Sequence, residues 1–210
     1  MSQSQGPVCK MCRRAGQKLF LKGQRCFGAK CAYERRDYVP GPRGKRMGRR
    51  RHSDYAKQMR EKQKIRQIYG LQEGQFRSYV RRAERMAGIS GENLLQLLER
   101  RLDNVVYRAG FASSRAQARQ LTTHRHLTVN GRIVTIPSYL VKVGDEVVVR
   151  EKSRDIVPIQ EAVASHAGGG SLSWLQVDKD NRAAKIVSLP ARVEIDADVD
   201  EQQVMEFYSR

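Results

Sequence analysis

The chain has 210 residues, 40% of them hydrophobic, so it is long enough for one or two cored domains and too apolar to be disordered throughout. Its formal net charge is +18, and residues 1–70 contribute +16 of this, because 20 Lys and Arg stand there against only four acids. Charge this one-sided repels itself and attracts polyanions, so nucleic acid is the expected partner. No apolar run approaches the roughly 20 residues of a membrane span, and no signal peptide or lipidation motif appears. We therefore expect a cytoplasmic protein without a membrane partner.

The only cysteines, Cys9, Cys12, Cys26 and Cys31, follow the pattern Cys-x2-Cys, thirteen residues, Cys-x4-Cys. Four thiolates closing on one point suit a structural Zn2+ and leave no open position for catalysis. Disulfides, free thiols or an iron–sulfur cluster would use the same residues. In a reducing cytoplasm, and with no other sign of electron transfer, we favour one structural zinc. It would hold together a segment too poor in apolar residues to fold alone.

A strongly basic stretch follows this segment. Residues 38–52, YVPGPRGKRMGRRRH, combine Gly, Pro and six basic side chains, which predicts an irregular cationic loop. Ser53 then caps a helix that should end at Gly70. Its cations line up at helical spacing, an arrangement that lowers stability unless an anion lies alongside, so we expect phosphate there.

Two more helices should follow, one over residues 72–87 and one from about Ser90 with a leucine-rich core face. Ser114 to Gln117 form a capping-box pattern that opens a short helix through Leu121. Arg115 and Arg119 should lie on the exposed side of that helix. Substituting either by alanine is expected to weaken RNA binding without lowering the melting temperature.

Hairpins dominate the rest of the chain. Asn130-Gly131 predicts a hairpin over residues 127–134, and YLVKV with EVVVR predicts a second one closing over Gly144-Asp145. Residues 158–166 look helical, Gly168–Gly170 form a flexible break, and a further short hairpin should run from Trp174 to Ser188. An acidic tail over residues 193–201 leads to an apolar C-terminus.

The predicted fold class is therefore α+β, with an N-terminal zinc module and helical domain followed by a compact α-helix/β-hairpin module. The zinc module covers residues 1–40. The basic loop and helical domain cover residues 41–98, and residues 198–210 should pack on them. The compact module, with its short hairpins and glycine-rich break, covers residues 99–197.

These residues resemble the family of small-subunit ribosomal protein S-four, in its zinc-binding bacterial form. The resemblance spans almost the whole chain and rests on the four-cysteine module, SDYAKQMREKQKIRQIYG (53–70), GENLLQLLE (91–99), RLDNVVYRAGFASSRAQARQL (101–121), TVNGR (128–132), IPSY (136–139) and the terminal EFYSR. It implies that the compact α-helix/β-hairpin module is an RNA-binding module. It also implies a structural constituent of the small ribosomal subunit that binds 16S rRNA as a primary binder and helps nucleate assembly. It also implies neighbouring small-subunit proteins as partners, a place near the channel by which mRNA enters, and a share in translational accuracy.

One residue departs from the family pattern. Arg125 stands in His124-Arg125-His126 where relatives have a His-Gly-His-like turn. A left-handed backbone at Arg125 would cost about 1 kcal/mol relative to glycine. Either the turn differs here or RNA contact compensates.

An enzyme is the main alternative, because similar RNA-binding modules occur in pseudouridine synthases and some tyrosyl-tRNA synthetases. Arg101-Leu102-Asp103 echoes a synthase's catalytic Arg-Leu-Asp, but that aspartate belongs to a separate domain after the module, and Arg100 stands where the synthase has glycine. We expect Asp103 to pair with an arginine or cap a turn, and we expect no catalysis and no small-molecule substrate. A zinc-containing transcription regulator is disfavoured, because no helix carries a base-reading set of Asn, Gln and Arg.

We expect RNA contacts from both cationic regions. The candidates are Lys22, Arg35, Arg36, Arg43, Lys45, Arg46, Arg49, Arg50, Arg51, Lys57, Lys62, Lys64, Arg66, Arg115, Arg119, Gln120 and His124.

Overall fold

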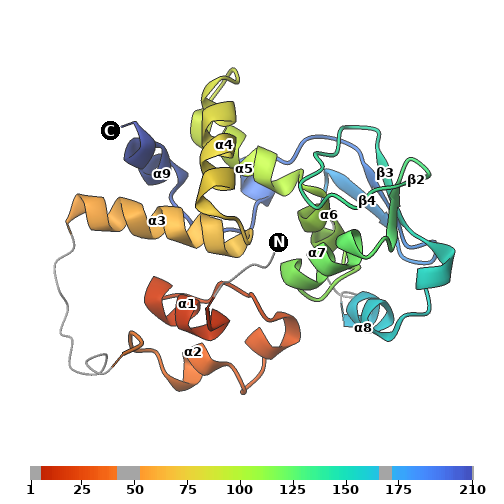
Figure 1. The fold of residues 1–210 in the computed structure, drawn as a ribbon, viewed down its shortest axis with the longest axis horizontal. Helices are drawn as coiled ribbons and strands as arrows, with labels where there is room; N and C mark the ends of the chain where they lie inside the picture. The colour runs from red at the N-terminus through yellow and green to blue at the C-terminus, as the bar shows by residue number, and fades with distance from the viewer. Residues whose placement is uncertain (1–5, 42–52, 166–171, 210) are drawn as a thin grey trace. The chain divides into compact units, whose positions relative to one another are not determined.

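The computed structural model describes residues 6–41, 53–165 and 172–209. The chain divides into two compact units, which we call unit 1 (Met1–Gly91 with Asp198–Arg210) and unit 2 (Glu92–Ala197). The sequence predicts a domain boundary at residue 40, between the four-cysteine segment and the helical segment. Both segments fall in unit 1, whose helices are labelled in Figure 1. Most of the expected basic loop, residues 42–52, and the glycine run 168–170 lie outside the described residues.

Unit 1 is helical. Its elements are α1 (Val8–Ala15), a 3-10 turn (Gly23–Cys26), α2 (Ala32–Arg35), α3 (Asp54–Ile68), α4 (Glu73–Glu84), the start of α5 (Ser90–Glu99) and α9 (Glu201–Tyr208). The expected helix after Ser53 is confirmed: the Ser53 hydroxyl accepts a hydrogen bond from the Ala56 amide at 3.3 Å. The helix ends at Ile68, and Gly70 follows two residues later with a φ of 63°, the left-handed conformation that terminates many helices.

The C-terminal helix α9 packs along α3 (Figure 1). Val204 is fully buried, and the Phe207 ring lies 5.5 Å from the Tyr55 ring. The Tyr208 hydroxyl donates to Glu73 of α4 at 2.7 Å. The apolar end of the chain therefore completes the core of unit 1, although more than 100 residues separate it from α3.

Unit 2 combines helices with one antiparallel sheet. Its elements are the remainder of α5, α6 (Leu102–Arg108), α7 (Arg115–Thr123), β1 (Leu127–Val129), β2 (Arg132–Ile133), β3 (Glu146–Val149), α8 (Val157–Ser165), β4 (Leu175–Asp178), β5 (Ala183–Ile186) and two 3-10 turns (Glu151–Ser153 and Arg192–Glu194). The strand order is β2-β1-β3-β5-β4. Together with the helices of unit 1, this confirms an α+β fold. Among the described helices of both units, none is long and apolar enough to span a membrane.

A single hydrophobic core holds unit 2 together. Buried residues of α6, α7 and α8 meet the inward residues of β1, β3 and β5, with Trp174 only 1% exposed. Two expected hairpins are confirmed. β1 and β2 join through Asn130-Gly131, both at positive φ, and β4 pairs with β5 within the segment from Trp174 to Ser188.

The hairpin expected between YLVKV and EVVVR is wrong. β3 pairs with β1 and β5 instead, so both of its edges are occupied by other strands. Residues 139–143 instead bond back toward the start of the unit: the Val141 amide donates to the Arg100 carbonyl, and Leu140 forms an isolated bridge with Arg101. The strand-like composition of residues 139–143 did not decide their pairing, because β1 and β5 form the backbone hydrogen bonds of β3 instead.

Arg125 takes up the left-handed conformation, with φ of 66°. The turn therefore keeps the geometry of a glycine turn without the glycine, at a backbone cost of about 1 kcal/mol. Two bonds close the turn, from the His126 amide to the Leu121 carbonyl and from the Arg150 guanidinium to the Arg125 carbonyl. The turn is thus held by contacts inside unit 2.

The contact between α9 and α4 generates a pH prediction. Burial opposes ionisation of Glu73, but hydrogen bonds from Tyr208 and Lys62 outweigh it and lower the pKa of Glu73 below its ordinary 4.5. A carboxyl with a depressed folded pKa adds stability above its unfolded pKa and loses it as pH falls through the folded value. Glu73→Gln should therefore lower the melting temperature of the protein at pH 7, and the gap to wild type should close as the pH falls below 4.5.

Glu84→Gln, at an exposed position of the same helix, is the matched control for a pH series of thermal melts. A gap between Glu73→Gln and wild type that stays constant down to about pH 3 would contradict the assignment.

Candidate RNA-binding surfaces and metal centre

The four cysteines line one small pocket in unit 1. Cys9 and Cys12 lie one turn apart on α1, Cys26 ends the first 3-10 turn, and Cys31 precedes α2. All four are free thiols; Cys9 is half-buried and the others are buried. The Lys22 amide donates to the Cys26 sulfur at 3.3 Å. Local folding thus brings together thiols that are up to 22 positions apart in the sequence.

The chemistry of this pocket suits a thiophilic cation. Burial raises the pKa of the Cys12 thiol, a hydrogen bond from the Leu19 backbone lowers it, and the three neighbouring thiols raise it further. A divalent cation would offset the repulsion between thiolates. Among the residues described, however, no three His, Cys, Asp or Glu side chains stand close enough to hold a metal ion. Four thiols are a donor set that suits Zn2+. To coordinate the ion, their sulfur atoms would have to move closer to one common point.

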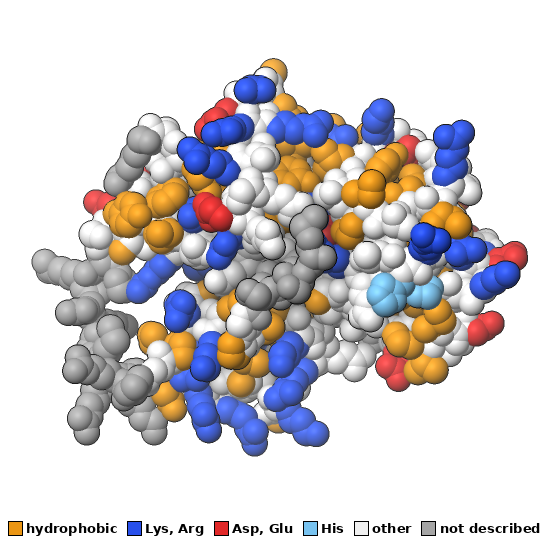
Figure 2. Space-filling view, viewed as in Figure 1, with side chains coloured by type: hydrophobic (Ala, Val, Ile, Leu, Met, Phe, Trp, Pro, Cys, Tyr) orange, Lys and Arg blue, Asp and Glu red, His pale blue; other side chains and the backbone are white. Residues whose placement is uncertain are grey.

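Several predicted RNA contacts of unit 1 are solvent-exposed. Lys22 lies before the first 3-10 turn, Arg35 and Arg36 end α2, and Lys57 lies in the first turn of α3. Figure 2 shows Lys and Arg side chains gathered over the α1–α2 region. Lys57 is paired with Asp54 at 2.9 Å but remains 57% exposed. The candidates Arg43, Lys45, Arg46, Arg49, Arg50 and Arg51 lie outside the described residues.

Lys62 does not fit the prediction of an RNA-facing side chain. Its side chain is 6% exposed, its ammonium donates to Glu73 at 2.9 Å, and it lies 4.6 Å from the centre of the Phe207 ring. Lys64 is also largely enclosed and pairs with Glu61 at 2.6 Å. These two cations are satisfied by acids and aromatic rings of unit 1, so we remove them from the RNA-binding set.

Helix α4 exposes a basic face that the sequence reasoning missed. Arg77, Arg81, Arg82 and Arg85 are all exposed, and Lys and Arg side chains cover this region of unit 1 in Figure 2. Arg77, Arg81 and Arg85 recur every four residues, which places them on one side of the helix. That spacing is the sequence signal for this face, and it is the same signal that pointed to the preceding helix.

In unit 2, a buried glutamate organises the expected RNA-binding helix. Glu99 is 1% exposed and accepts hydrogen bonds from Arg108 Nε at 3.0 Å and Asn104 Nδ2 at 2.7 Å. Asn104 Oδ1 in turn accepts from Arg115 Nε at 2.7 Å, and the Arg115 guanidinium lies 4.6 Å from the centre of the Tyr107 ring. The guanidinium of Arg115 is therefore fixed from α5 and α6 before any ligand arrives.

A second buried acid has the same role for the next turn of α7. Asp103 binds the buried Arg101 at 2.9 Å and lies 3.9 Å from the Arg119 guanidinium. The expectation that Asp103 pairs with an arginine is confirmed. The expectation that Arg115 and Arg119 lie on the exposed side of the helix is wrong, because their side chains are only 14% and 27% exposed.

The outer side of α7 presents the remaining candidates. Gln120 and His124 are exposed, and the His124 ring lies 6.3 Å from that of His126. His126 is hydrogen-bonded to Ser153 at 2.9 Å, and burial, followed by the nearby His124 and Arg150, lowers its pKa. At neutral pH this face therefore offers hydrogen-bonding groups beside fixed arginines, a combination suited to reading RNA shape.

Comparison with known proteins accounts for the whole chain. Residues 3–99 match the model of the ribosomal protein S4/S9 N-terminal domain, and residues 100–147 match that of the S4 domain. The chain is 54% identical over 210 residues to small ribosomal subunit protein uS4 of Natranaerobius thermophilus, 53% to that of Pelotomaculum thermopropionicum and 52% to that of Geotalea daltonii, covering 100% of both chains each time. This chain belongs to the uS4 family.

Membership of the uS4 family confirms the family resemblance seen in the sequence, apart from its zinc-binding form, and decides against the enzyme alternative. Unit 2 contains the S4 domain match, and its Arg101-Leu102-Asp103 is a buried ion pair within that domain rather than the catalytic aspartate of a separate one. The family is one of structural ribosomal proteins, and this chain is not an enzyme.

The network around Glu99 revises the expectation for Arg115. Glu99→Ala should lower the free energy of unfolding by about 3–5 kcal/mol, because it leaves arginine side chains without their buried partner. Arg115→Ala should lower it by about 1–3 kcal/mol, since it leaves buried hydrogen-bonding groups unsatisfied. Urea unfolding followed by fluorescence of Trp174, which lies in the core of the same unit, is the measurement.

Gln120→Ala, at an exposed position of α7, is the matched control and should change stability by less than about 0.5 kcal/mol. If Arg115→Ala unfolds at the same urea concentration as this control, the network contributes nothing to stability.

Proposed function

We propose that this chain is a structural constituent of the small ribosomal subunit, in the cytoplasmic ribosome, and binds 16S rRNA directly. The observation that carries the proposal is the full-length identity of 52–54% to proteins named small ribosomal subunit protein uS4. Ribosomal RNA and neighbouring ribosomal proteins are then its partners. The residues themselves supply an independent physical argument for the RNA.

The first argument is electrostatic. Residues 1–70 carry a net +16, and the described acids of that segment neutralise only a few of its cations, through pairs such as Lys57 with Asp54 and Lys64 with Glu61. The remaining exposed cations repel one another in water. Phosphate supplies the missing negative charge, and binding releases the counterions condensed on RNA. Unit 1 is therefore the main source of affinity.

The second argument concerns orientation. In unit 2, Glu99, Asn104 and Asp103 hold Arg115 and Arg119 in fixed positions. Guanidinium groups held in place lose little freedom on binding and present planar donors to phosphate and sugar oxygens. Gln120 and His124 add exposed hydrogen-bonding groups beside them. Because the A-form major groove excludes side chains, this face would recognise RNA by shape and 2′-hydroxyl groups.

Finer aspects of the role also belong to the proposal. We infer early binding that helps nucleate subunit assembly, a position near the channel by which mRNA enters, mRNA contact there, and a contribution to translational accuracy. A wide cationic surface joined to a rigid, shape-reading module suits a protein that fixes the fold of an RNA junction.

The zinc of the four-cysteine segment is a separate proposal. Cys9, Cys12, Cys26 and Cys31 would hold one structural Zn2+, which links α1, the 3-10 turn and the start of α2 and catalyses nothing. Support comes from the donor set, from the shared pocket, and from the Lys22 amide that donates to the Cys26 sulfur. Hydrogen bonds of this kind orient metal ligands.

The RNA proposal predicts a salt-dependent and RNA-selective complex. The logarithm of the affinity for 16S rRNA should fall linearly with the logarithm of salt concentration, by about 0.7–0.9 per phosphate contacted. Arg77→Gln with Arg81→Gln should reduce that slope, whereas Lys179→Gln with Lys185→Gln, which remove the same charge from unit 2, should reduce it less. Filter binding over a salt series measures both.

A complex insensitive to salt would contradict this account. Tighter binding to duplex DNA of equal length than to 16S rRNA would favour the transcription-regulator alternative instead.

The zinc proposal predicts one zinc per chain in protein purified without chelators, measured by elemental mass spectrometry. Chelation should speed hydrogen exchange across residues 8–35 and leave unit 2 unchanged, because α1 and α2 have few buried apolar residues of their own. Protein that contains no zinc, or whose α1 amides exchange equally fast with and without chelator, would contradict it.

A further inference from the structure

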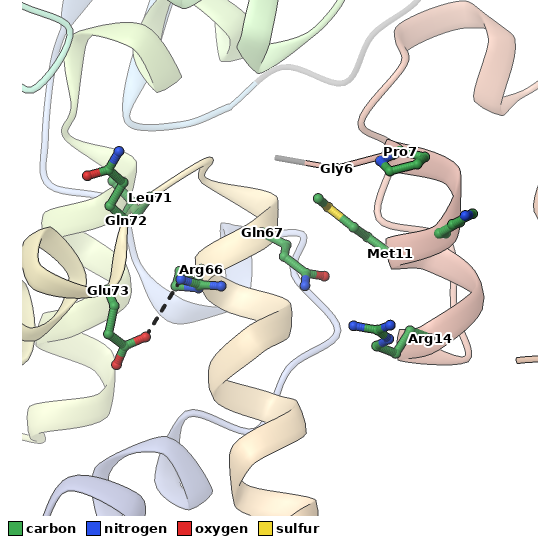
Figure 3. Close-up of a pocket in the computed structure, with 10 residues that line it drawn as sticks. Gly6, Pro7, Met11, Arg14, Arg66, Gln67, Leu71, Gln72 and Glu73 are labelled. Atoms are coloured by element: carbon green, nitrogen blue, oxygen red, sulfur yellow. Dashed lines mark ion pairs between the residues drawn. The ribbon is translucent and has the colours of Figure 1, made fainter. Parts of the chain in front are cut away.

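Unit 1 contains an open pocket of about 440 Å³ between α1 and the segment where α3 ends and α4 begins. One wall is formed along α1, with Lys10, Met11 and Arg14. The other is the end of α3 and the start of α4, with Arg66, Gln67 and Leu71 among its residues. In Figure 3, Met11 and Arg14 project from α1 toward Gln67 of α3.

The charges around the pocket favour an anion. Lys10, Arg14 and Arg66 contribute three cations, and Glu73 is the one acid among the lining residues. That carboxylate is already engaged, because it accepts from Lys62 at 2.9 Å and from Tyr208 at 2.7 Å. It lies 3.8 Å from Arg66, which is beyond hydrogen-bond range.

Arg66 supplies a second, independent sign of a missing ligand. Its Nε atom is buried and has no hydrogen-bond partner among the described residues. Buried N–H donors in native proteins nearly always have a partner, and an exception calls for a ligand, ion or water. The dashed contact in Figure 3 joins Glu73 to Arg66, and the atom of Arg66 that it reaches is Nη1 rather than Nε.

The remaining walls indicate the rest of the ligand. Met11 and Leu71 offer an apolar, polarisable surface, and Gln67 and Gln72 offer amides that both donate and accept. The pocket is within the size range that accommodates small organic ligands, and larger than a single phosphate needs. A nucleotide combines these properties: a planar base with hydrogen-bonding edges, joined to a phosphate.

We propose that this pocket receives one unpaired nucleotide of the bound RNA, with its phosphate at Lys10, Arg14 and Arg66 and its base against Met11 and the glutamine amides. The inference rests on the proposed function, because it takes the RNA as bound. It adds a discrete site to what would otherwise be a diffuse cationic surface. Unpaired bases splayed from RNA are commonly recognised in this way.

The test separates pocket filling from charge. Gln67→Trp fills the pocket without changing charge, and Gln75→Trp places the same bulk at an exposed position of α4 that does not line it. Lys10→Gln with Arg14→Gln removes two charges from the pocket, and Arg25→Gln with Lys30→Gln removes two exposed charges elsewhere in the four-cysteine segment. Thermal melts verify that each full-length variant folds.

Binding to 16S rRNA and chemical probing of its unpaired bases are the readouts. Gln67→Trp and the Lys10/Arg14 variant should each bind at least tenfold more weakly than their controls. Both should also expose the same one or few unpaired nucleotides that wild-type protein shields. Unchanged affinity and footprint for Gln67→Trp, or equal losses for the two charge-removing variants, would overturn the proposal while leaving rRNA binding intact.

Two further arms address other outcomes. Adenosine monophosphate or inorganic phosphate that binds the protein saturably and displaces the RNA from this site at micromolar concentration would assign the pocket to a free ligand instead. If wild-type protein shows no preference for 16S rRNA, the proposed function itself fails, and that result is distinguishable from failure of the pocket alone.

Discussion

The balance between cations and the few acids available to them governs this molecule. Three acids each fix a largely buried arginine or lysine inside the fold: Glu73 holds Lys62, Glu99 holds Arg108, and Asp103 holds Arg101. Buried charges require such partners, so these acids determine which basic side chains become structural. The cations left over lie on the surface, and they are concentrated in unit 1. The few acids therefore stabilise the core by pairing with buried cations. Because there are so few of them, the surface of unit 1 keeps a net positive charge that favours an anionic partner.

The two units meet this constraint in different ways. In unit 1, helix α9 places the Tyr208 hydroxyl within hydrogen-bond distance of Glu73 and the Phe207 ring against the Lys62 ammonium. Unit 2 places its acids close to the start of α6, so Arg115 and Arg119 are held from within the unit. One unit presents many exposed charges, and the other presents a few fixed ones. This difference underlies the division between affinity and orientation in the proposed function.

Sequence patterns predicted those features that depend on neighbouring residues. The Ser53 and Ser114 caps, the Asn130-Gly131 turn and the hairpin after Trp174 are local, and all are observed. The misplaced features depend on distant partners. The sequence predicts Lys62 as an RNA contact, because nothing near it in the sequence indicates that Phe207 of α9 lies against it. YLVKV has the composition of a strand, but β1 and β5 occupy both edges of β3. Arg115 follows the helical spacing of a surface residue, yet an asparagine eleven positions earlier binds it.

Lysine acetylation with mass spectrometry, on the free protein and on its complex with 16S rRNA, tests the central claim most directly. Lys10, Lys22, Lys30 and Lys57 are exposed, whereas Lys62 is buried against its own acid. The account predicts that RNA protects the exposed lysines from modification and that Lys62 reacts slowly in both states. Equal labelling of the exposed lysines with and without RNA would show that solvent, rather than RNA, neutralises the charge of unit 1, and would contradict the account.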